Sequence, residues 1–133
     1  MQCAQTLQGI WESTLHSLGE WEQQMMKGKL ILEMQAQGLE EVLEKLSDII
    51  IKLKWFLYTV ETQIFIRDEA RSWVIMIELK KIIEMMSQEW DLKVSLSQQA
   101  TGLLEKRKMV AYTWVTEPYM DESYLAALPK KFF

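Results

Sequence analysis

Apolar residues recur at spacings of three and four through almost the whole chain, and this pattern constrains the fold more than any other feature. That spacing matches the period of an α-helix, and the patterned stretches are long enough for helices of about 25 to 35 residues. We therefore predict an all-α fold, an antiparallel helical bundle with long coiled-coil-like helices. Three to four helices and a short C-terminal helix fit into a single domain, residues 1–133.

The first helix is predicted to begin near Ala4. It should end at Gly28, because a residue without a Cβ atom readily adopts the left-handed conformation that terminates helices. Its apolar stripe, with one threonine in the series, consists of Leu7, Trp11, Thr14, Leu18, Trp21 and Met25.

The second segment has the strongest helical pattern. An unbroken helix over residues 30–66 would be about 55 Å long at the rise of an α-helix. Two pairs on its polar side, Glu41 with Lys45 and Asp48 with Lys52, have the favourable i,i+4 order. The apolar stripe consists of Leu39, Val42, Leu46, Ile49, Leu53, Phe56 and Val60.

A third helix is predicted after a polar break at residues 67–69, with Asp68 as its N-cap. Residues 73–77 are apolar on all sides, which is also typical of a buried strand, but the helical spacing that follows favours a helix. Such a run should be buried under several elements or under another chain. The pattern weakens over residues 97–102, where we expect the helix to end or kink.

A shorter fourth helix is expected over residues 103–116, stopped by Pro118. Asp121 can cap one last helical turn. Residues 118–133 then form a C-terminal docking tail, because two phenylalanines at its end should pack on something.

The residue types needed for catalysis or metal binding are scarce. His16 is the only histidine and Cys3 the only cysteine, so an internal disulfide, a zinc site and a Ser-His-Asp triad are all excluded. The glutamates at positions 40, 41 and 44 are interpreted as a solvated helix face. We expect no enzymatic activity, no metal and no cofactor.

Charge and hydropathy narrow the range of partners. A net charge of −4 and an isoelectric point near 5.1 argue against direct binding of nucleic acid. No apolar run approaches the roughly 18 to 20 residues that span a bilayer. The single cysteine fits a reducing compartment, so we expect a cytoplasmic or nuclear protein without a membrane segment.

The chain has six tryptophans and nine methionines, and its apolar helical rows together with the all-apolar residues 73–77 supply more apolar surface than a short helical hairpin can cover. Most of these residues should form the core, but some should meet a protein partner, since Trp and Tyr are common interface anchors. The candidate partner-binding residues are Trp11, Trp21, Trp73, Trp114, Tyr119, Leu125, Leu128 and Phe132.

Three short segments resemble the family of the ribosome maturation factor AIRIM. They are residues 8–15 (QGIWESTL), 42–46 (VLEKL) and 127–132 (ALPKKF), and they occur in the order found in that family. Residues 84–85, Trp114 and residues 118–119 are more weakly similar to its partner, the cyclin-dependent-kinase-two-interacting protein. The resemblance implies a non-catalytic helical adaptor that pairs with a second helical subunit.

The same resemblance implies docking on a hexameric AAA+ unfoldase that acts in pre-60S ribosome maturation. Two other functions fit the pattern of the residues. One is a self-associating coiled-coil spacer, and the other is a helical bundle that binds a small apolar ligand. As an adaptor the chain would form hetero-oligomers, and as a coiled-coil spacer it would form homo-oligomers.

Overall fold

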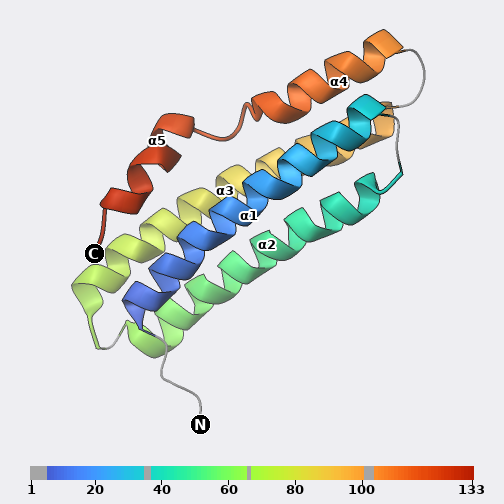
Figure 1. Ribbon diagram of the computed structural model, residues 1–133. Coiled ribbons are helices and arrows are strands. Elements are labelled where there is room, and N and C mark those ends of the chain that lie inside the picture. Colours follow the sequence, from blue (N-terminus) through green and yellow to red (C-terminus); the bar gives the residue numbers. More distant parts are fainter. Residues whose placement is uncertain (1–5, 35–36, 66, 101–103) are drawn as a thin grey trace.

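The computed structural model describes residues 6–34, 37–65, 67–100 and 104–133 (Figure 1). Five α-helices and no strand occur in these ranges, and 88% of the structure is helical. The predicted all-α bundle is therefore confirmed.

Three long helices form the body of the bundle. They are α1 (Leu7–Met34), α2 (Leu39–Thr59) and α3 (Glu69–Gln99). α2 packs against both α1 and α3, and a single π-helical turn, Val60–Ile64, extends it. In Figure 1 the three helices run side by side along the length of the molecule. Their apolar stripes meet in one core.

The prediction that the first helix ends at Gly28 is wrong, because α1 continues to Met34. Gly28 is buried, and a Cβ atom there would lie 2.3 Å from the indole ring of Trp114. The glycine therefore allows a close approach inside the helix. Among the glycines that the structure describes, Gly38 is the left-handed one, with φ of 115°, at the N-cap of α2. The second helix consequently begins at Leu39 and not near residue 30.

The predicted cap of α3 and its helical structure over residues 73–77 are confirmed, but Trp73, Val74 and Ile77 are exposed, so that run is not buried under several elements of the chain. The Asp68 side chain accepts a hydrogen bond from the Arg71 backbone N–H at 3.4 Å. The apolar run over residues 73–77 is helical, and the helix ends at Gln99. Residues 101–103, where the fourth helix was expected to start, lie outside the described residues.

One of the two predicted ion pairs on α2 is present. Lys45 Nζ lies 3.3 Å from Glu41 Oε1. Lys52 instead contacts Glu20 of α1, at 3.0 Å. Lys52 therefore joins two helices.

α4 (Leu104–Thr116) packs against α1 and α3, and Pro118 follows its end as predicted. The chain then turns into α5 (Glu122–Ala127), where Asp121 acts as the predicted N-cap by accepting from Tyr124 N–H at 3.0 Å. A short 3-10 turn, Leu128–Lys130, follows. In Figure 1 α4 and α5 lie along the same side of the three long helices, α4 near one end and α5 near the other.

The C-terminal tail docks on its own chain. The Phe132 ring packs edge-on against Trp11, with centroids 4.9 Å apart. Lys131 Nζ contacts Glu78 Oε1 at 2.9 Å, and the Tyr124 hydroxyl donates to the other oxygen of Glu78. These contacts fix residues 118–133 to α1 and α3.

Candidate functional site

Two tryptophans are exposed on the α2–α3 hairpin. Trp55 is 58% exposed and Trp73 is 57% exposed, whereas most apolar side chains of these helices are buried or partly buried. Large apolar side chains accompany them on both helices. We call this set the hairpin face, and it consists of Ile51, Trp55, Tyr58, Trp73 and Ile77.

On α2, the spacing of the residues produces the hairpin face. Ile51, Trp55 and Tyr58 follow one another at intervals of four and three, so they share one side of the helix. That side lies opposite the buried stripe that includes Leu46 and Leu53. The rings of Trp55 and Tyr58 stack, with centroids 5.6 Å apart. The stacked pair presents a broad aromatic surface to solvent.

On α3, Trp73 and Ile77 occupy successive turns. α2 and α3 are consecutive helices of an antiparallel hairpin whose connection lies between Ile64 and Glu69. Tyr58 precedes this connection by less than two turns, and Trp73 follows it by about one turn. Both halves of the hairpin face are therefore at the same end of the bundle.

The opposite side of the bundle is covered by α4. Trp114 of α4 is fully buried, and its indole Nε1–H donates to the Met25 backbone oxygen at 2.7 Å. α4 packs against α1 and α3, whereas α2 has its main contacts with α1, α3 and its own π-helical extension. Within the described residues, no element comparable to α4 lies over the hairpin face.

Four of the eight candidate partner-binding residues are buried inside the chain, so their assignment to a partner surface needs correction. Trp11, Trp21, Trp114 and Leu128 are at most 2% exposed. The residue pattern did not indicate this burial, which results from packing between the long helices and the segment after α3. The Trp21 indole donates to Glu117 Oε2 at 2.8 Å.

The other four candidates differ in accessibility. Leu125 and Phe132 are partly buried and pack against the core. Trp73 and Tyr119 are exposed, at 57% and 47%. Of these four, Trp73 alone lies on the hairpin face. The structure therefore does not bring the predicted set together as one surface.

Sequence reasoning missed the α2 half of the hairpin face. Ile51, Trp55 and Tyr58 all lie off the apolar stripe of their helix, and that offset was the available signal. Large apolar residues on the polar side of an amphipathic helix are typical of contacts with another chain. Trp90, by contrast, is partly buried and donates to the Leu43 backbone oxygen at 2.8 Å.

Charged residues are buried where α4 meets α3. Lys93 and Glu89 have fully buried side chains, with Lys93 Nζ 3.3 Å from Glu89 Oε1 and 3.3 Å from Glu117 Oε2. Lys93 Nζ also donates to the Trp114 backbone oxygen at 2.6 Å. Glu89 in turn accepts from the Tyr119 backbone N–H at 3.0 Å. We call Glu89, Lys93 and Glu117 the buried cluster.

Within the buried cluster, Glu117 has an unusual backbone conformation and a raised pKa. Its φ of 46° lies in the left-handed region, which is unfavourable for residues other than glycine. Burial raises the pKa of Glu117 above its usual value, and this effect exceeds the opposing effects of Lys93 and the Trp21 indole. The cluster joins α1, α3 and the segment after α4, so its role in the fold is to fix that segment.

Residues 6–34, 37–65, 67–100 and 104–133 contain no cluster of metal ligands. Among the described residues, no group of three His, Cys, Asp or Glu side chains is arranged to hold a metal ion. His16 is 79% exposed at its side chain and lies 3.7 Å from Glu20. No helix in the described ranges is both long and apolar enough to cross a membrane.

In comparisons with family models, with curated protein sequences and with solved structures, nothing matches this chain.

Proposed function

We propose that this protein is a non-catalytic helical adaptor that binds another helical protein through its hairpin face. The observation that carries the proposal is the pair of tryptophans, Trp55 and Trp73, each more than half exposed at the same end of one hairpin. A free aromatic surface of this kind is unfavourable in water, and covering it with a partner recovers hydrophobic free energy.

The residue types of the hairpin face suit an interface. Trp and Tyr bury large areas and lose little side-chain entropy, and they dominate the binding energy of many protein interfaces. Trp55 and Tyr58 already stack on each other, which reduces the ordering needed on binding.

The form of the hairpin face suits a helix as the bound element. Apolar residues stand on successive turns of two antiparallel helices, and an amphipathic helix can place its apolar stripe against them. Exposed charges of both signs border the face in the sequence, among them Lys54, Glu69 and Lys80. A partner helix whose apolar stripe is bordered by charged residues of both signs would therefore be favoured.

The more specific part of the proposal rests on the family resemblance alone. In that version, the second helical subunit occupies the hairpin face, and the pair docks on an AAA+ unfoldase that acts in pre-60S maturation. The protein itself contributes binding, and any ATP hydrolysis belongs to the unfoldase.

A homodimeric coiled-coil spacer is the competing function, since the same apolar face could pair with a second copy. The mass of the purified protein in solution separates the two. An adaptor is monomeric alone and enlarges only when the other helical subunit is added, whereas a spacer dimerises by itself.

The adaptor function is tested by a double substitution, Trp55→Glu with Trp73→Glu. Both side chains are exposed, so helicity and thermal stability should change little. Two buried carboxylates at the interface should weaken association by at least about a hundredfold. The measurement is co-purification with the second helical subunit and the AAA+ unfoldase, followed by titration of the subunit alone.

The matched control is Met109→Glu with Tyr112→Glu on α4. These side chains are 71% and 73% exposed, and the control adds the same charge. It should leave binding intact. The proposal fails if the hairpin variant binds as well as wild type, or if the α4 variant alone loses the partner.

A further inference from the structure

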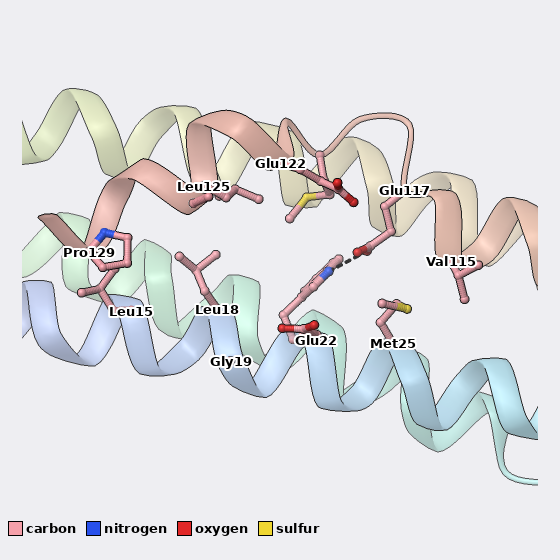
Figure 2. Close-up of a pocket in the computed structure, with 13 residues that line it drawn as sticks. Leu15, Leu18, Gly19, Glu22, Met25, Val115, Glu117, Glu122, Leu125 and Pro129 are labelled. Atoms are coloured by element: carbon pink, nitrogen blue, oxygen red, sulfur yellow. Dashed lines mark hydrogen bonds between the residues drawn. The ribbon is translucent and has the colours of Figure 1, made fainter. Parts of the chain in front are cut away.

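A pocket of about 370 Å³ lies between α1 and the segment that follows α4 (Figure 2). Its volume is within the range of small-molecule sites in proteins. Figure 2 shows Leu15 and Leu18 of α1 facing Leu125 and Pro129 across the opening. The apolar part of its wall consists of Leu15, Leu18, Trp21, Met25, Val115, Met120, Leu125, Ala126 and Pro129.

The polar part of the same pocket carries charge of one sign. Three glutamates, Glu22, Glu117 and Glu122, line it, and none of its 13 lining residues, all of them described, is basic. An apolar cavity whose charged groups are all carboxylates is complementary to a molecule that has an apolar body and a positive end.

The negative charge at the inner end of the pocket is only partly balanced. Lys93 is the one cation of the buried cluster, and it contacts carboxylates of both Glu89 and Glu117 at 3.3 Å. The Trp21 indole N–H and Lys93 both approach Glu117 at Oε2. One lysine therefore serves two carboxylates. A second cation in the pocket would compensate the remaining charge in a site partly shielded from water.

We propose that this pocket binds a small amphipathic amine, with its apolar body between α1 and α5 and its ammonium group near Glu117. Glu22 and Glu122 at the rim are exposed and attract the cation without forming part of the core. Charge-assisted hydrogen bonds to a carboxylate are stronger than neutral ones, so the ammonium gives selectivity over alcohols of the same shape. This site is independent of the hairpin face.

Gly19 provides a way to close the pocket without disturbing the fold. It lines the cavity, and a Cβ atom built there has no neighbour within 4 Å. A leucine at this position should therefore extend into the pocket rather than into the core. Gly19→Ala is the matched control, because it also replaces a helical glycine but leaves most of the cavity open.

The probe is 3-phenylpropylamine, compared with 3-phenyl-1-propanol and 3-phenylpropionate, which have similar size and shape. Binding is measured by titration with NMR detection of the tryptophan indole N–H signals. We expect the Trp21 signal to shift and the Trp73 signal to stay fixed. The amine should bind at least about tenfold more tightly than the alcohol, and the acid more weakly than either.

Two pairs of variants complete the test. Gly19→Leu should weaken amine binding at least about tenfold, whereas Gly19→Ala should retain it. Glu22→Gln with Glu122→Gln should lower the preference for amine over alcohol in part, because Glu117 remains, and Glu40→Gln with Glu44→Gln on α2 should preserve it in full.

The proposal is overturned if amine and alcohol bind equally, if neither binds, or if Gly19→Leu binds the amine as well as wild type. Trp55→Glu with Trp73→Glu should leave amine binding unchanged. Failure here is thus distinguishable from failure of the adaptor function, which is read from partner binding alone.

Discussion

The two sides of this bundle differ in which side chains they bury. Where α4 covers α3, Lys93 and Glu89 are completely buried. At the turn end of the α2–α3 hairpin, Trp55 and Trp73 are more than half exposed. Polarity alone would predict the reverse. The difference shows that cover by a second layer of helices, rather than the nature of the residue, decides what is buried in so small a domain.

The covered side stabilises the fold, whereas the hairpin face is available for a function. On the covered side, every charge of the buried cluster has a named partner, and the cluster holds α4 and the C-terminal segment in one position. On the hairpin face, the aromatic residues contribute little to holding the chain together. Their free surface is available to another protein, and that availability is the basis of the adaptor proposal.

The largest effect should come from removing the cation on the covered side. Lys93→Ala leaves Glu89 and Glu117 buried without their cation, and breaking a buried pair in this way costs about 3–5 kcal/mol. Trp73→Ala on the hairpin face should change stability by no more than about 0.5 kcal/mol. Unfolding in urea measures both. The comparison breaks if the tryptophan substitution proves the more destabilising of the two.

A smaller loss is expected where Trp114 packs on α1. Gly28→Ala places a Cβ atom 2.3 Å from the indole ring, and such overpacking costs about 1–3 kcal/mol. Gly19→Ala on the same helix meets no neighbour and should stabilise by about 0.5–1 kcal/mol. Thermal unfolding of the two variants gives shifts of opposite sign. Equal shifts would mean that Trp114 is not held against α1.

The smallest effect concerns the protonation of Glu117. Burial raises its folded-state pKa, so its contribution to stability is fully present below the unfolded value near 4.5 and is lost as pH rises through the folded pKa. Glu117→Gln cannot ionise. The difference in unfolding free energy, variant minus wild type, should therefore increase as the pH rises from about 4.5 through the folded-state pKa of Glu117. Lys93, Glu89 and the Trp21 indole face the carboxyl and stay unchanged in the comparison. A difference that is constant with pH would contradict the prediction.

Local features of the sequence predicted the local structure well. Asp68 and Asp121 cap their helices as expected, since an aspartate before an apolar helical pattern needs no distant partner to act. The helical reading of residues 73–77 is also confirmed, because the spacing beyond the run continues at the period of a helix.

Features that depend on distant contacts were not predictable in the same way. Gly28 fits a helix end by local rules, and its role inside α1 follows only from the ring of Trp114. Lys93 and Glu89 have the i,i+4 spacing of an ordinary surface pair, and α4 makes them internal. Trp21 and Trp55 are the same residue type on neighbouring helices, and only the position of Trp55 off the apolar stripe of α2 distinguished the exposed tryptophan from the covered one.

The contact between Gly28 and Trp114 has a consequence for how this sequence can diverge. An enlarged residue 28 is tolerated only if residue 114 shrinks in the same lineage, and a smaller residue 114 leaves a void that glycine cannot fill. In related sequences, residues 28 and 114 should therefore change together. Such joint variation would indicate that those proteins also pack α4 on α1 in this way.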